Sequence, residues 1–116
     1  MDMNANTNIA MKACIDHCMK CHQVCLRTVL TYCIEVGGDH AAPDHVRLML
    51  NCAEICQASA NLQLSGSAFS AKLCGVCSEI CEACAVSCEA KDELADCVQA
   101  CRECTESCKS MAMMSH

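Results

Sequence analysis

Cysteine is the residue type in this chain whose number and spacing could support chemistry. Sixteen of the 116 residues are cysteine, and fifteen of them recur at intervals of three and four residues. The fifteen form four series: Cys14, Cys18, Cys21 and Cys25; Cys52 and Cys56; Cys74, Cys77, Cys81, Cys84 and Cys88; and Cys97, Cys101, Cys104 and Cys108. Cys33 follows the first series at a distance of eight. Thiolates bind soft metal ions and also take part in redox reactions, so both chemistries must be weighed.

The spacing of three and four residues is the core periodicity of a helix packed in a bundle. Residues spaced in this way lie along one helix face, where leucine and isoleucine usually fill the core. Here thiols occupy that face. Cysteine fills little volume and aromatic residues make up only 2% of the chain, so such a core would be underpacked unless something completes it. A bound metal is the natural candidate.

A cysteine content this high is typical of secreted, disulfide-linked scaffolds, but several features oppose that interpretation. Residues 1–11 are polar and lack the apolar run of a signal peptide. Glycine and proline, at four and one, are too few for a loop-rich scaffold. Neighbouring cysteines on one helix face also have nearly parallel Cα–Cβ bonds, which disfavours pairing. We therefore expect reduced thiols and a cytoplasmic protein, because the cytosol keeps thiols reduced.

Helical patterning extends over most of the chain. It predicts four helices, at about 9–36, 44–64, 68–90 and 93–111. No period-two pattern of a β-strand occurs over any length. Four such helices with short connections predict a single domain, residues 1–116, that is all-α: an antiparallel up-down four-helix bundle with a cysteine-lined core.

Turn and cap residues predict where these helices begin and end. Gly37 and Gly38 should end the first helix, and Pro43 suits the first turn of the second. Asp92 is the predicted cap of the fourth helix. Residues 1–8 are expected to form a short polar arm. The expected C-terminal tail contains Met113, Met114 and His116.

Soft thiolates select Cu(I), Zn(II) or iron–sulfur clusters. Iron–sulfur motifs usually lie in loops, unlike the C-x₃-C-x₂-C-x₃-C spacing found here, and the Glu-x-x-His motif of di-iron bundles does not occur. Structural zinc requires separate tetrahedral groups, whereas Cu(I) accepts two or three sulfurs and lets one thiolate bridge two ions. One Cu(I) per thiolate also neutralises the buried charge. These grounds favour many Cu(I) ions per chain, with a zinc or general thiolate metal buffer as the alternative.

A thiol-disulfide oxidoreductase is the rival from another functional class. It would use the four C-x-x-C pairs Cys18–Cys21, Cys74–Cys77, Cys81–Cys84 and Cys101–Cys104. Redox pairs of this kind need a helix N-terminus to activate one thiol, usually in a βαβ context. Most of these pairs fall in the middle of predicted helices, so we expect no enzymatic activity.

Charge and hydropathy exclude two other classes of partner. The net charge of −6 argues against nucleic-acid binding. No apolar run approaches the roughly 20 residues of a membrane span. The expected ligand is therefore a metal ion.

The cysteine-containing segments resemble the bacterial four-helix-bundle copper storage proteins. The resemblance is carried by residues 14–25, 51–56, 73–84 and 97–104 and extends over nearly the whole chain. It implies a thiol-lined bundle that stores many Cu(I) ions and assembles as a homotetramer. One branch of the family is exported by an N-terminal signal and the other is cytosolic, and this chain resembles the second. A copper chaperone is then a candidate partner besides the copper ions.

His45 and Met49 precede Cys52 and Cys56 on the core face of the second predicted helix. In an antiparallel bundle they lie at the same end as Cys33, where the family resemblance implies an open end. We interpret His45 and Met49 as an entrance, because imidazole and thioether bind Cu(I) less tightly than bridging thiolates. The alternative is a solvated loop beside an ordinary core methionine. The predicted metal ligands are thus all sixteen cysteines together with His45 and Met49.

Overall fold

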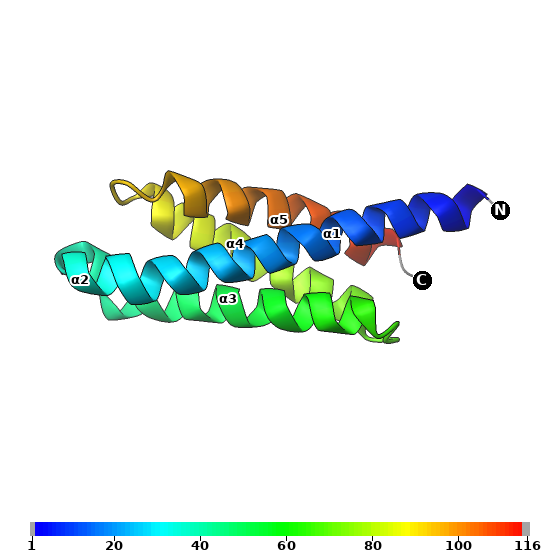
Figure 1. Ribbon diagram of the computed structural model, residues 1–116, viewed down its shortest axis with the longest axis horizontal. Helices are drawn as coiled ribbons and strands as arrows, with labels where there is room; N and C mark the ends of the chain where they lie inside the picture. Colours follow the sequence, from blue (N-terminus) through cyan, green and yellow to red (C-terminus); the bar gives the residue numbers. More distant parts are fainter. Residues whose placement is uncertain (1, 115–116) are drawn as a thin grey trace.

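The computed structural model describes residues 2–114, and long helices dominate it. The long helices are α1 (Asp2–Arg27), α3 (Pro43–Leu64), α4 (Ser70–Glu89) and α5 (Ala95–Met114) (Figure 1). The first continues through a π-helical turn η1 (Thr28–Cys33) into α2 (Ile34–Val36), and a 3₁₀ turn η2 (Gly38–Ala41) then leads to α3. No strand occurs among the described residues.

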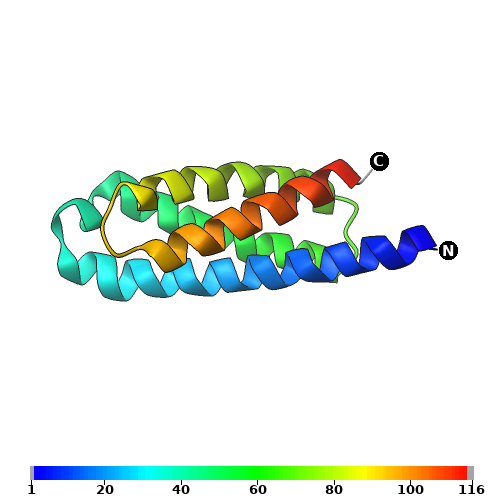
Figure 2. The same cartoon turned by 90° about the horizontal axis from the view of Figure 1, so that it is seen from above.

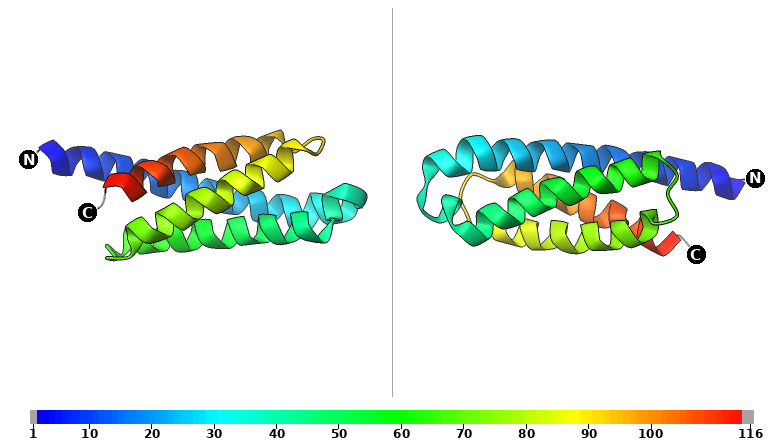
Figure 3. Two further views of the ribbon diagram at one scale, coloured as in Figure 1. Left: turned by 180° about the vertical axis from the view of Figure 1, so that it is seen from behind. Right: turned by 90° about the horizontal axis from the view of Figure 1, so that it is seen from below.

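The helices form an elongated antiparallel bundle, 52 × 20 × 18 Å in extent. Helix α1 packs beside α3 and α5, and α4 packs beside the same two helices, so that α1 and α4 lie diagonally opposite (Figure 2). This confirms the predicted up-down four-helix bundle. The two termini and the α3–α4 turn lie at one end, whereas η2 and the α4–α5 turn lie at the other (Figure 3).

Both ends of the helical region extend further than predicted. Helix α1 begins at Asp2, so the predicted polar arm of residues 1–8 was wrong. Extending an existing helix requires only propagation and not a new nucleus, and these residues contain no helix breaker. Helix α5 runs to Met114, so Met113 and Met114 are helical and not a tail, while His116 lies outside the described residues.

The connections follow the turn chemistry in part. Gly37 ends the first helix with a positive φ of 75°, and Pro43 lies in the first turn of α3, as predicted. The predicted cap Asp92 was wrong, because α5 begins only at Ala95. The intervening Glu93 takes a positive φ of 65°, which turns the chain without a glycine.

Thiols fill the centre of the bundle. Each of the sixteen cysteines is no more than 1% exposed. Aliphatic side chains such as Ile15, Leu48 and Ile55 are only partly buried and pack around this centre. No described helix combines the length and the apolar character needed to cross a lipid bilayer. The interior therefore depends on sulfur where an ordinary bundle depends on leucine.

The π-helical turn explains how Cys33 reaches the core. Eight residues of regular α-helix would leave Cys33 about 80° around the axis from Cys25. A π-helix winds through a smaller angle per residue than an α-helix. Within η1, both Val29 and Cys33 are buried as a result. The local change of helix type brings the one cysteine outside the regular series into line with the others.

Candidate metal centre

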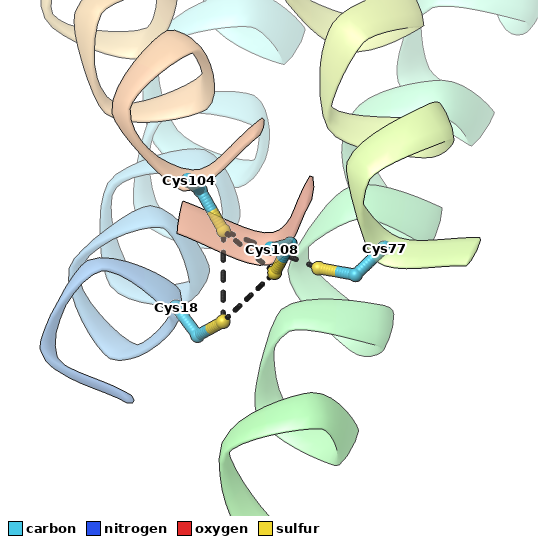
Figure 4. Close-up of side chains that lie close together, drawn as sticks. All are labelled: Cys18, Cys77, Cys104 and Cys108. Carbon is cyan, nitrogen blue, oxygen red and sulfur yellow. Dashed lines mark hydrogen bonds between the residues drawn. The ribbon is translucent and has the colours of Figure 1, made fainter. Parts of the chain in front are cut away.

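Sulfur atoms from all four long helices meet along the bundle axis. The Sγ of Cys56 on α3 lies 3.5 Å from that of Cys81 on α4 and 3.7 Å from that of Cys104 on α5. The Sγ of Cys104 lies 3.6 Å from that of Cys18 on α1 (Figure 4). Contacts of this kind connect helices that are far apart in the sequence.

Twelve of the cysteines fall into four compact groups. Within each group, all sulfur atoms lie within 4.8 Å of one another. The groups are Cys14, Cys74 and Cys108; Cys18, Cys77, Cys104 and Cys108; Cys21, Cys56, Cys81 and Cys104; and Cys21, Cys25, Cys52 and Cys101. We call these twelve residues the sulfur column.

Adjacent groups of the sulfur column share members. Cys108 belongs to the first and second groups, Cys104 to the second and third, and Cys21 to the third and fourth. Metal–sulfur bonds of about 2.3 Å would place one ion within reach of the sulfurs of a group. If every group held an ion, each shared thiolate would have to bridge two of them. The arrangement is thus a continuous series of sites and not a set of separate ones.

The protonation of the thiols depends on their neighbours. Hydrogen bonds from Cys104 and then Cys108 lower the pKa of Cys18 to about 6. Cys33 has no comparable sulfur donors, and burial raises its pKa above the ordinary 9.0. Hydrogen bonds with Cys108 and then Cys18 raise the pKa of Cys104 itself, because a donor that keeps its proton resists ionisation. Metal loading must therefore displace protons from thiols of unequal acidity.

The end of the bundle beside η2 contains a different set of side chains that could bind a metal ion. The Sγ of Cys33 lies 3.8 Å from Nε2 of His45 and 3.9 Å from Sδ of Met49. Three further buried cysteines near this end belong to none of the four groups: Cys84, Cys88 and Cys97. We call Cys33, His45, Met49 and these three cysteines the mixed-ligand end.

The surroundings of His45 would let its Nε2 atom bind a metal ion. It is 3% exposed, and this burial lowers its pKa below 6.5, so the imidazole is neutral near pH 7. Its Nδ1 lies 2.7 Å from Oγ of Ser87 on α4. With the proton on Nδ1 donated to Ser87, Nε2 presents its lone pair toward Cys33.

Polar contacts link the two connections that cover the mixed-ligand end. The Nε2 of His40 lies 2.9 Å from the carbonyl oxygen of Asp92, which joins η2 to the α4–α5 turn. The hydroxyl of Tyr32 donates to the carboxylate of Glu93 in the same turn. The rings of Tyr32 and His40 meet edge to face, with centroids 5.7 Å apart. His40 thus links η2 to the α4–α5 turn and to Tyr32, and none of these contacts involves Cys33, His45 or Met49.

Two other histidines lie between helices and outside the sulfur groups. The Nδ1 of His17 is hydrogen-bonded to Oγ of Ser107 on α5. The Nδ1 of His22 lies 2.7 Å from the carbonyl oxygen of Ala53 on α3. Both side chains therefore link neighbouring helices.

Sequence reasoning assigned no role to the buried pair Ser59 and Gln63. These residues are 0% and 2% exposed and touch sulfurs of the column. Their position on the same face of α3 as Cys52 and Cys56 was the available signal. Their contacts with Cys14 and Cys74 depend on the packing of three helices and could not be deduced from spacing alone.

A family model described as copper storage protein matches residues 7–113. The chain belongs to the copper storage protein family. The family resemblance of the cysteine-containing segments is therefore confirmed.

This copper storage family member also resembles solved structures in its three-dimensional fold. The Nmul_A1745 protein of Nitrosospira multiformis is 55% identical, with a TM-score of 0.92 over 93% of this chain and 99% of that one. The Cu(I)-bound copper storage protein BsCsp3 is 34% identical, with a TM-score of 0.81 over 89% of this chain and 98% of that one.

A curated relative of this copper storage family member is the uncharacterized cysteine-rich protein YhjQ of Bacillus subtilis strain 168. It is 35% identical over 68 residues, which is 59% of this chain. The match spans 62% of the length of that relative.

Proposed function

We propose that this protein stores many Cu(I) ions in the cytoplasm by binding them to the thiolates inside its bundle, and that it performs no catalysis. The sharing of sulfurs between adjacent groups is the observation that carries the proposal. Cu(I) accepts two or three thiolates and lets one thiolate bridge two ions, so a series of overlapping sites suits it. Family membership and the Cu(I)-bound state of a 34% identical relative support the same ion.

Charge favours Cu(I) as well. Burying an uncompensated thiolate in a bundle of this kind is unfavourable. A Cu(I) ion that replaces one thiol proton leaves the net charge of the interior unchanged, whatever number of ions has entered. A Zn(II) ion bound by four thiolates would instead leave two negative charges in place. A store that fills gradually is therefore easier to build with Cu(I).

The proposed ligands are all sixteen cysteines, with His45 and Met49 as an entrance. The sulfur column would hold most of the ions. At the mixed-ligand end, Cys33, His45 and Met49 offer one thiolate and two neutral ligands around a single space. Neutral imidazole and thioether ligands bind Cu(I) without adding charge, which suits an ion in transit.

Zinc buffering is a second candidate function, favoured by one group of the column. The sulfurs of Cys21, Cys25, Cys52 and Cys101 are separated by 3.6 to 3.9 Å in five of their six pairs. A regular tetrahedron with zinc–sulfur bonds of 2.3 Å has edges of about 3.8 Å. Taken by itself, this group would accept Zn(II) with little movement.

The cellular context of the store is also part of the proposal. Sixteen unpaired cysteines are best maintained in the reducing cytoplasm. We infer that residues 1–116 act as a single domain and assemble as a homotetramer that receives Cu(I) from a copper chaperone. Exposed apolar side chains on the outer face of α4, namely Val76 and Val86, are consistent with assembly.

An anaerobic Cu(I) titration of the reduced protein, with a chromogenic Cu(I) chelator as competitor, tests the proposed function. We expect the protein to retain more than about ten Cu(I) ions per chain, since roughly one ion enters per thiolate. A parallel titration with Zn(II) distinguishes the second candidate. Saturation at one tightly held Zn(II), with weak retention of Cu(I), would replace the storage function by zinc buffering.

A further inference from the structure

The sulfur column ends in a pair of buried polar side chains on α3. The Nε2 of Gln63 donates to the Sγ of Cys14 at 3.5 Å and lies 3.3 Å from Oγ of Ser59. That hydroxyl in turn lies 3.5 Å from the Sγ of Cys74. The pair lies toward the end of the bundle that contains the α3–α4 turn, next to the group formed by Cys14, Cys74 and Cys108. We call this group the terminal group.

Packing alone does not explain a buried glutamine at this position. The Oε1 of Gln63 is buried and has no hydrogen-bond partner in the part of the chain that the structure describes. An unpaired buried polar atom is unfavourable, and an apolar side chain of the same size would avoid it. Because this cost is not offset in the metal-free fold, we expect the amide of Gln63 to stabilise another state of the protein.

The composition of the sulfur groups identifies that state. The terminal group has three sulfurs, whereas each of the other three groups has four, and Cys14 and Cys74 belong to this group only. In a loaded column, no metal ion would lie beyond Cys14 and Cys74 on the side of Gln63 and Ser59, so the charge of these two thiolates would be compensated from one side only. They are the two sulfurs that Gln63 and Ser59 contact.

We propose that Gln63 and Ser59 donate hydrogen bonds to the thiolates of Cys14 and Cys74 when the terminal group is loaded. The donors take the place of the metal ion that the end of the column lacks. This inference rests on the proposed Cu(I) storage function. Gln63 and Ser59 act as positioning residues that complete the last site without binding the metal.

The donors already face the sulfurs before loading. The Nε2 of Gln63 donates to the Sγ of Cys14 and also to the carbonyl oxygen of Ser59, at 3.3 Å. When a metal ion displaces the proton of Cys14, the same N–H faces a thiolate, and a hydrogen bond to a charged acceptor is stronger than one to a thiol. An apolar residue could not donate such a bond.

The test compares three variants with the wild type: Gln63→Leu, Ser59→Ala and, as a matched control, Gln57→Leu. Leucine is chosen because it offers no metal ligand. Gln57 lies on the same helix, but its amide contacts Asn61 and no sulfur. In competition with a Cu(I) chelator, Gln63→Leu should hold the ion of the terminal group about tenfold or more weakly, because hydrogen bonds to charged groups are the strong ones. Ser59→Ala should show a smaller loss, and the control should match the wild type.

Two further measurements separate this role from simple packing. The metal-free Gln63→Leu variant should melt no lower than the wild type, because it removes an unpaired buried oxygen. The side-chain amide signal of Gln63 in the ¹H–¹⁵N spectrum of the wild type should shift during copper loading, while that of Gln57 should not.

The possible outcomes are distinct. If Gln63→Leu retains every ion as tightly as the wild type, or if its metal-free form is destabilised as much as its copper binding is weakened, the proposed role is wrong. An amide signal that does not respond to loading leads to the same conclusion. If the wild type itself fails to bind many Cu(I) ions, the proposed function fails first, before any variant is compared.

Discussion

The sulfur column and the mixed-ligand end lie in the same bundle but differ in how their ligands are connected. In the column, Cys21, Cys104 and Cys108 each belong to two groups. At the mixed-ligand end, Cys33 instead faces a neutral imidazole and a thioether. In the proposed store, shared thiolates would tie neighbouring ions together and neutralise charge, whereas the set of Cys33, His45 and Met49, with two neutral ligands, would hold an ion more weakly. Under that proposal the sulfur column retains copper and the mixed-ligand end transfers it.

Replacing shared sulfurs should produce the largest effect. The double variant Cys21→Ser/Cys104→Ser should lose more Cu(I) ions than the thiols it removes, because each of these sulfurs serves two groups. The matched variant Cys88→Ser/Cys97→Ser removes the same number of buried thiols from outside the groups and should lose fewer. Anaerobic titration of both variants measures the difference. Equal losses would show that sharing does not matter.

Copper loading should strongly stabilise the fold. Ions that bind only the folded bundle add their binding free energy to its stability, by roughly 4 kcal/mol for a ligand at 1,000 times its dissociation constant. The melting temperature should therefore rise with each increment of Cu(I). Thermal melts at increasing copper-to-protein ratios measure this. A melting temperature that does not change would place the ions on the surface and remove the basis of the comparison.

Variants at the mixed-ligand end should change rate more than capacity. His45→Ala combined with Met49→Leu leaves the whole column intact, so most of the copper should still bind. Stopped-flow removal of copper by a strong chelator should give a different rate from the wild type. His22→Ala is the control, because this histidine bonds to a backbone carbonyl and not to a sulfur. Identical removal kinetics for the wild type and the double variant would show that the entrance lies elsewhere.

The smallest predicted effect is the pH dependence of the metal-free protein. The pKa of His45 is lowered by burial, so below pH 6.5 the unfolded chain takes up a proton that the folded chain resists, and stability falls. The pKa of Cys33 is raised by burial, so above pH 9.0 the unfolded chain loses a proton that the folded chain keeps, and stability falls again. Melting temperatures of the apo protein across this range measure both limbs.

Two variants measure how much His45 and Cys33 contribute to these limbs. His45→Gln should flatten the acid limb. Cys33→Ser should reduce the alkaline limb only in part, because the pKa values of other buried thiols, such as Cys74 and Cys88, are raised as well. An acid limb that persists unchanged in His45→Gln would mean that other groups, and not the buried imidazole, set the acid sensitivity.

Spacing alone predicted the bundle and the burial of the regular cysteine series. A period of three and four residues is a strong signal, because it fixes a helix face whatever the rest of the chain does. The same spacing predicted that Cys52 and Cys56 are buried, and it placed His45 and Met49 on the core face of α3. These are local properties of one helix, which the sequence states directly.

Other features depend on contacts between helices and could not be predicted in this way. The spacing of Cys33 looked irregular until the π-helical turn η1 brought it into the core. The roles of Ser59 and Gln63 follow from their contacts with α1 and α4. The start of α1 at Asp2 was missed because no residue near it marks a boundary. The contacts of Ser59 and Gln63 lie outside the local sequence pattern, whereas η1 and the start of α1 are changes in helix type and helix length that the spacing of cysteines does not report.

X-ray absorption at the copper edge of the fully loaded protein tests the central claim most directly. Shared thiolates bring successive copper ions close together, so the account predicts a sulfur shell of about three atoms with a clear copper–copper contribution beyond it. The Cys21→Ser/Cys104→Ser variant should lose part of that contribution. A sulfur shell with no copper–copper contribution in the loaded wild type would mean isolated sites, and would contradict a column of shared thiolates.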